Sequence, residues 1–153
     1  MLIRKATVED IDLLVSLRLD YIRADWGSLT AEAEGTIATQ FRSYLMEHLP
    51  AGDFAAVLAM EGETVMAAAY LVISEKPANP VYPNGITGLI LNVLTYPAYR
   101  RRGIATRLLE ALIAEARQAG VSCLELSATE DGMPLYEKLG FTASRCPAMR
   151  LNL

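Results

Sequence analysis

The sequence predicts a mixed α/β (α+β) domain in which helices cover both faces of one sheet. Apolar runs of strand length and amphipathic runs of helix length follow one another in the order β-α-α-β-β-β-α-β-α-β. The chain has 153 residues, of which 52% are hydrophobic, and this is enough for a substantial core. No repeat or low-complexity tract interrupts the pattern, so we expect a single domain over residues 1–153.

The first third of the chain predicts one strand followed by two helices. Residues 2–6 form a short apolar run, and Thr7-Val8-Glu9-Asp10 resembles a helix capping box with aspartate in place of the usual glutamate. Apolar side chains then recur at helical spacing, which predicts a helix over about 8–24. The same spacing predicts a second helix over roughly 30–48, which ends at Pro50-Ala51-Gly52.

The middle of the chain predicts three strands. The apolar runs 54–60 and 65–73 are joined by Glu61-Gly62-Glu63, which is typical of a hairpin loop. Residues 74–87 are rich in Pro, Asn and Gly and predict a loop, after which 88–95 predicts the next strand.

The last third predicts a helix, a strand, a short helix and further strands. Residues 104–119 carry an apolar stripe at helical spacing, and 121–128 form another strand-like run. A short helix fits 132–139. We expect 141–143 and 148–153 to complete the fold as strands.

The turn between the predicted strand 88–95 and helix 104–119 has the composition of an anion site. It reads Arg100-Arg101-Arg102-Gly103-Ile104-Ala105. The first N–H groups of a helix have no intrahelical partner, the helix dipole is positive there, and glycine lets a phosphate approach the backbone. The alternative is a solvated basic turn with a glycine that starts the helix.

The overall charge favours a small anionic ligand over a nucleic acid. The net charge is −4, and the isoelectric point is near 5.0. Only three of the 14 basic residues are lysines, and the arginines concentrate at 100–102. A local basic patch on an acidic protein suits a small anion, so we expect no nucleic-acid partner.

Cysteine usage and hydropathy predict a cytoplasmic protein with no metal site. Cys123 and Cys146 form no pair with metal-ligand spacing and are interpreted as thiols of a reducing compartment. Charged residues follow the N-terminus at once, which is unlike a signal peptide. The longest apolar run, 66–73, is far shorter than the roughly 20 residues of a membrane span, so we expect no membrane partner.

Three segments in the second half of the chain together resemble one family. They are Thr95-Tyr96-Pro97, the loop Arg100-x-x-Gly103-x-Ala105, and Leu135-Tyr136-Glu137-Lys138-Leu139-Gly140-Phe141. These segments resemble the V-x-P strand end, the pyrophosphate loop and the L-Y-E-K-x-G-F segment of the GNAT (Gcn5-related) N-acetyltransferases. The resemblance is specific over about 88–141 and implies a mostly antiparallel sheet and an acyltransferase that uses acetyl-CoA as co-substrate.

The resemblance implies two sets of cofactor-binding residues. In the family, backbone amides of a splayed fourth strand hold the pantetheine and the thioester carbonyl, which here implies Val93, Leu94 and Thr95. The pyrophosphate loop corresponds to Arg100, Arg101, Arg102, Gly103, Ile104, Ala105 and Thr106. Many members also place an Asn after the fifth strand. This chain has none there, and Thr129 is its candidate substitute.

The catalytic residues are assigned by the same resemblance. Tyr136, within the LYEKLGF segment, is the candidate general acid that protonates the CoA thiolate, and the alternative is a tyrosine that packs a short helix. Glu125 is the candidate base at a position that often relays protons through water, and the alternative is an ion-paired strand residue. Glu130, Asp131, a water relay or an amine that arrives neutral are further alternatives.

The first helix and the loop after it are expected to bind the acceptor. Arg18 interrupts the apolar stripe, and Asp25 beside Trp26 could receive a cationic amine. We therefore expect acetylation of the primary amine of a small molecule, by a monomer or a homodimer. A protein N-terminus or lysine as acceptor, and a non-catalytic acyl-CoA sensor, are the alternatives.

Overall fold

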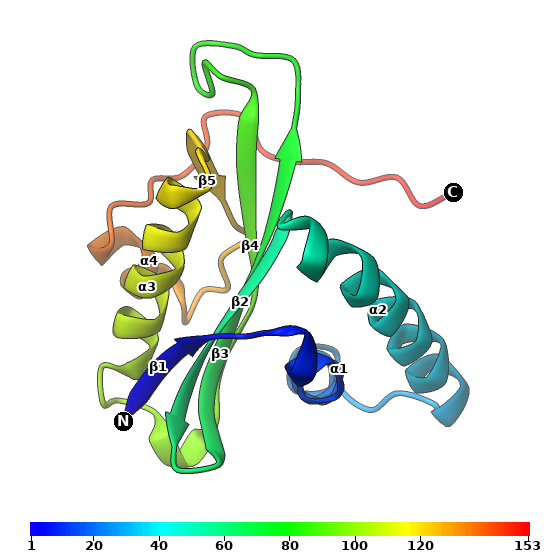
Figure 1. The fold of residues 1–153 in the computed structure, drawn as a ribbon. Helices are drawn as coiled ribbons and strands as arrows, with labels where there is room; N and C mark the ends of the chain where they lie inside the picture. Colours follow the sequence, from blue (N-terminus) through cyan, green and yellow to red (C-terminus); the bar gives the residue numbers. More distant parts are fainter.

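A five-stranded sheet runs through the middle of the molecule, and the structure, a computed structural model, describes residues 1–153 (Figure 1). The strands lie in chain order, β1 to β4 pair in antiparallel fashion, and β5 is parallel to β4. Their bounds are Leu2–Lys5 for β1, Phe54–Glu61 for β2, Thr64–Glu75 for β3, Ile86–Thr95 for β4 and Cys123–Glu125 for β5.

Helices cover both faces of this sheet, with α1 and α2 on one side and α3 and α4 on the other (Figure 1). Their bounds are Ile11–Trp26 for α1, Ala31–Ala51 for α2, Ile104–Gln118 for α3 and Met133–Lys138 for α4, with single 3-10 turns at Val8–Asp10 and Pro97–Tyr99. The observed order therefore confirms the predicted mixed fold up to the last helix.

The central strands are apolar at nearly every position because both of their faces are buried. In β2, Phe54, Ala56 and Leu58 join the core beneath α1 and α2. The alternate residues Val57 and Ala59 join the core beneath α3. Two separate apolar clusters thus form on either side of the sheet, and each fixes one pair of helices against it.

The start of α1 is held by a side-chain network that the capping-box pattern predicted. The Thr7 hydroxyl accepts from the Glu9 N–H, and the Asp10 carboxylate accepts from the Thr7 N–H and, at 2.8 Å each, from two nitrogens of Arg4 on β1. Further along, the Tyr70 hydroxyl of β3 donates a 2.7 Å hydrogen bond to the Leu14 carbonyl of α1. These bonds anchor α1 to the sheet at two places.

A β-bulge near the end of β4 opens the sheet beside β5. The pairing with β3 shifts register, because Tyr70 faces Leu91 whereas Ala68 faces Leu94. Asn92 lies in the bulge with a φ of 57°. The parallel pairing with β5 ends at Leu89, so the second half of β4 has no partner strand on that side.

The predicted strands over 141–143 and 148–153 do not form. The chain after α4 runs as an extended segment along the outside of the domain (red in Figure 1). Met149, Leu151 and Leu153 are 96%, 82% and 114% exposed, so their alternation buries nothing. The alternating pattern was misleading here because a strand also needs a partner edge to pair with.

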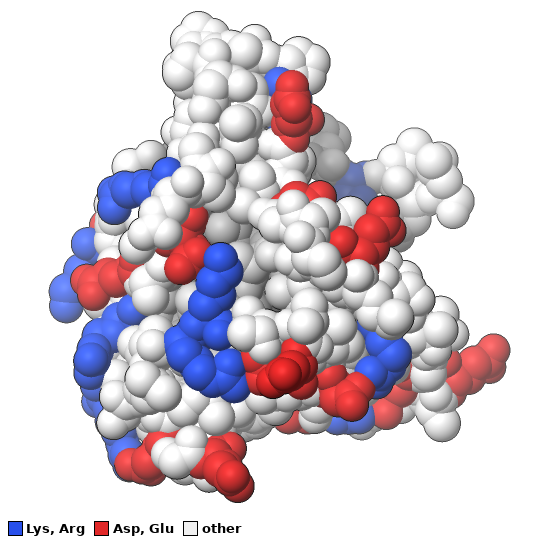
Figure 2. All heavy atoms as spheres, in the orientation of Figure 1, with Lys and Arg blue, Asp and Glu red and all other residues white.

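The surface in Figure 2 carries acidic and basic side chains intermixed, with no broad area of one sign on that face. The helices of the fold lack the combination of length and apolar character that crossing a membrane requires.

Candidate active site

Two cavities lie against neighbouring faces of the C-terminal half of α1. Arg18, Ile22 and Trp26, spaced by four residues, line one cavity of about 710 Å³. Tyr21 and Asp25 line the other, of about 820 Å³. Because side chains four residues apart share one face of a helix, α1 presents one face to each cavity and forms a wall between them.

The larger space, called here the arginine-loop cavity, lies where β4 separates from β5. Its walls come from the end of β4, the turn before α3, the start of α3, the loop after β5 and the side of α4. The predicted cofactor residues that line it are Val93, Leu94, Thr95, Arg100, Arg101, Gly103, Ile104, Ala105, Thr106 and Thr129.

The start of α3 presents free backbone donors to this cavity. Gly103 is the N-cap in a left-handed conformation with a φ of 72°, and no side chain caps the helix. The first intrahelical bond runs from the Arg107 N–H to the Gly103 carbonyl, so the amides of residues 104–106 are available to a ligand. A Cβ at Gly103 would meet no atom within 4 Å and would project into open space.

The three arginines of the turn take different positions. Arg100 donates through Nε to the Thr95 carbonyl at 3.1 Å, which ties the turn to the end of β4. Arg101 lines the cavity, with a φ of 60°. Arg102 does not line it, because its guanidinium lies over the Tyr99 ring at 5.6 Å from the centroid. Of the predicted loop residues, Arg102 alone lies outside the cavity.

Tyr136 reaches the same cavity from α4. Its ring packs edge-on against Phe141, with centroids 6.0 Å apart. Burial, and then the neighbouring Tyr21 phenol, raise the pKa of Tyr136 above its usual range, so the hydroxyl stays protonated at neutral pH. Gly132 leaves room for this ring, because a Cβ there would lie 3.0 Å from Cε2 of Tyr136. The sequence reasoning missed this role of Gly132.

The candidate base and the two alternative carboxylates do not lie together in one cavity. Glu125 sits on β5 opposite Leu89, is about half exposed, and forms a 4.0 Å ion pair with Lys76. It lines neither cavity, so the structure favours the ion-paired alternative for it. Asp131 lines the arginine-loop cavity and Glu130 does not.

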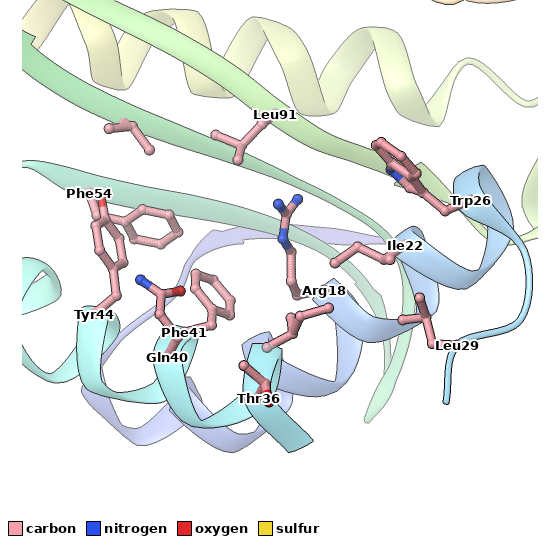
Figure 3. A pocket seen from close by; sticks show the side chains of 12 residues that line it. Arg18, Ile22, Trp26, Leu29, Thr36, Gln40, Phe41, Tyr44, Phe54 and Leu91 are labelled. Atoms are coloured by element: carbon pink, nitrogen blue, oxygen red, sulfur yellow. The ribbon is translucent and has the colours of Figure 1, made fainter. Parts of the chain in front are cut away.

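The smaller space, called here the apolar cavity, lies between α1, α2 and the sheet (Figure 3). Nine of its 12 lining residues are hydrophobic. Arg18 points from α1 toward the strand that carries Leu91, in the middle of the cavity, with Phe41 and Gln40 of α2 beside it (Figure 3). The polar lining consists of Arg18, Thr36 and Gln40.

Asp25 and Trp26 do not share a cavity. Asp25 lines the arginine-loop cavity, whereas Trp26 lines the apolar cavity and is 75% exposed. The cause is helical geometry, because adjacent residues at the end of α1 point roughly 100° apart around the helix. The predicted carboxylate–aromatic pair is therefore not a single cation site.

Asn92 is a residue that the sequence reasoning did not place in the site. It is 1% exposed, its Oδ1 accepts a 3.3 Å hydrogen bond from Arg18 Nη1, and its Nδ2 has no partner. The available signal was a polar residue between Leu91 and Val93, within a mostly apolar strand. Asn92 links the bulge of β4 to the charged group of the apolar cavity.

A sheet that opens at a bulge, beside an uncapped helix start and a protonated tyrosine, is the architecture of an acyltransferase. The acetyltransferase (GNAT) family model matches residues 16–141, and the chain belongs to this family. Most of the loop that resembles the family's pyrophosphate loop, and Leu135 and Tyr136 of the tyrosine segment, line the arginine-loop cavity.

Solved structures of acetyltransferases are similar to this chain over nearly its whole length. A predicted acetyltransferase with acetyl-CoA from Clostridium acetobutylicum has 28% identity and a TM-score of 0.88, over 99% of this chain and 95% of that one. A GCN5-related N-acetyltransferase from Ralstonia eutropha JMP134 has 26% identity and a TM-score of 0.82, over 98% and 97% of the two chains. No curated protein matches this chain in sequence.

Proposed function

We propose that this protein transfers the acetyl group of acetyl-CoA to the primary amine of a small molecule. The observation that carries the proposal is the uncapped start of α3, where Gly103 faces open space beside the unpaired edge of β4. A long anionic thioester needs free backbone donors at both places, one set for phosphate and one for the acyl end.

The arginine-loop cavity supplies both sets of donors. The amides of residues 101–106 would receive the pyrophosphate, with Arg100 and Arg101 adding positive charge. The N–H groups between Val93 and Thr95 that point to the free edge of β4 would hold the pantetheine arm and polarise the thioester carbonyl. When bound, acetyl-CoA supplies an activated acetyl group. The relative from Clostridium acetobutylicum was solved with that molecule.

Tyr136 acts as the general acid. The neutral amine forms a C–N bond with the acetyl carbonyl carbon, and the C–S bond breaks. Tyr136 gives its phenolic proton to the departing thiolate and regains one from the ammonium product through water. Its raised pKa keeps that proton available throughout the neutral range.

The proton of the incoming amine leaves through water. Glu125 pairs with Lys76 and lines neither cavity, so the proposal assigns it no direct contact with the amine. An amine that loses its proton before attack needs only positioning beside the thioester.

A small acceptor is favoured by the size of the apolar cavity. Its volume of about 710 Å³ lies within the range of pockets that bind small molecules, and most of its lining is apolar.

A thiol-release assay with acetyl-CoA and a panel of small amines tests the proposal. We expect thiol release that depends on the amine, together with an acetylated product detected by mass spectrometry. Tight binding of CoA with no acetylation of any small amine or peptide would contradict the proposal and favour a non-catalytic acyl-CoA sensor.

A further inference from the structure

The apolar cavity contains one charged side chain without a counter-ion. Arg18 is the only charged residue among the 12 that line it, and no carboxylate pairs with it. Arg23, one turn further along the same helix, is by contrast exposed and paired with Glu34 at 2.7 Å. Unlike Arg23, Arg18 therefore does not stabilise the surface of α1 through an ion pair, and its charge is available to a ligand.

The contacts of Arg18 leave most of its donors free. One Nη1–H reaches Asn92 Oδ1 at 3.3 Å, and the guanidinium lies 6.0 Å from the centroid of the Tyr21 ring. Burial lowers the pKa of Arg18, because removing the charged guanidinium from water is unfavourable. A half-buried guanidinium with free N–H groups is costly unless an anion pairs with it.

We propose that the apolar cavity binds a free amino acid with an apolar side chain, and that Arg18 holds its carboxylate. The planar guanidinium matches a carboxylate through two parallel hydrogen bonds. The side chain would lie among the aromatic groups at the other end of the cavity, around Phe41, Tyr44 and Phe54. This inference names the acceptor class for the acetyl transfer proposed above and rests on that function.

The position of Arg18 places the amine of such a ligand near the donor site. Arg18 contacts Asn92, and the next residue, Val93, already lines the arginine-loop cavity. In an α-amino acid the amine is one carbon away from the carboxylate. A carboxylate on Arg18 would therefore hold the amine at the boundary of the two cavities, close to the amides proposed to bind the thioester.

Binding measurements separate this inference from its alternatives. We would titrate L-phenylalanine, L-phenylalaninamide and phenethylamine into the CoA-saturated protein and measure heats by calorimetry, with L-leucine and L-tryptophan as further amino acids. Losing hydrogen bonds to a charged group should weaken the two compounds without a carboxylate roughly 10- to 100-fold. Equal affinity of all three phenylalanine-related compounds, or no binding of any amino acid, would overturn the inference.

The variant Arg18→Met tests the role of the guanidinium directly. It should remove the preference for L-phenylalanine over its amide, while Arg18→Lys keeps part of it because the charge remains. Arg23→Met, on the same helix but outside both cavities, is the matched control and should keep the full preference. Unchanged CoA binding by calorimetry confirms that each variant is folded. A preference that survives in Arg18→Met would contradict the inference.

Turnover distinguishes the two proposals. If phenethylamine and L-phenylalanine release thiol with equal kcat/KM, the carboxylate inference fails and acetyl transfer stands. If L-phenylalanine binds through Arg18 but no amine is acetylated, the carboxylate site stands and the transfer proposal fails.

Discussion

The two cavities beside α1 obtain their polar groups in different ways. About half of the lining of the arginine-loop cavity comes from short segments that are contiguous or nearly so in the chain, 93–95, 99–101 and 103–106. The apolar cavity is lined by side chains from α1, α2 and three strands, and its single charge comes from Arg18. Under the two proposals, the donor would be recognised by backbone geometry and the acceptor by side-chain chemistry.

The largest effect is expected from Tyr136→Phe. Loss of a general acid should lower kcat by about 10²- to 10⁴-fold, with CoA affinity nearly unchanged, because the ring still packs against Phe141. Stopped-flow thiol release, with chemistry rate-limiting, measures this. Tyr99→Phe in the same cavity is the control and should keep kcat within roughly 3-fold, since that ring carries Arg102 and its phenol has no proposed role in transfer.

The pH profile separates an acid role of Tyr136 from a packing role. An acid must be protonated, so its contribution is present below its pKa and lost above it. Since the pKa of Tyr136 is raised, wild-type activity should not fall from this cause until the pH exceeds the usual tyrosine range near 10. Two results would contradict the role: wild-type activity that already decreases with rising pH before pH 9, or a kcat of Tyr136→Phe equal to that of the wild type.

The next effect is expected from Gly103→Val. The added side chain would fill the open space before α3 and block close approach of phosphate, so CoA affinity should fall by roughly 10- to 100-fold in calorimetry. Gly62→Val is a matched control, because Gly62 also has a positive φ, of 60°, and open space around it, but lies in the β2–β3 hairpin. Equal CoA affinity in the two variants would contradict the assignment of the loop.

The smallest effect is expected from the two neighbours at the end of α1. Trp26→Ala removes an apolar contact whose loss should weaken acceptor binding by about 1 kcal/mol. It should therefore raise the acceptor KM roughly 5-fold and leave the acetyl-CoA KM unchanged. Asp25→Asn should leave the acceptor KM unchanged and slightly lower the acetyl-CoA KM, because it removes a negative charge from a cavity that binds an anion. If both variants raise the acceptor KM, α1 does not separate the two sites.

Local signals explain which elements were predictable from sequence. The apolar stripe over 104–119 and the capping box at Thr7 act within one segment, and both are confirmed with small shifts at the ends. The residues of the arginine-loop cavity could be predicted for the same reason, because the arginine turn is contiguous in the sequence. The strand expected at 148–153 did not form because its pairing depends on an edge elsewhere in the molecule.

The apolar cavity was harder to predict because its residues come together only after folding. Arg18 and Asn92 are 74 residues apart in the chain, and their contact depends on the bulge in β4. Asp25 and Trp26 are adjacent in sequence, yet helical rotation sends them to different cavities. A pattern in the sequence records which side chains are present but not which of them face one another.

The position of α1 as a wall has a consequence for how such a protein diversifies. If the two proposals hold, substitutions on one face of the helix, at Ile22 or Trp26, would reshape the space for the acceptor, while the neighbouring face would keep its contacts around the acetyl donor. New acceptors would then be accommodated by a few changes along a single helical stripe, without rebuilding the cofactor site.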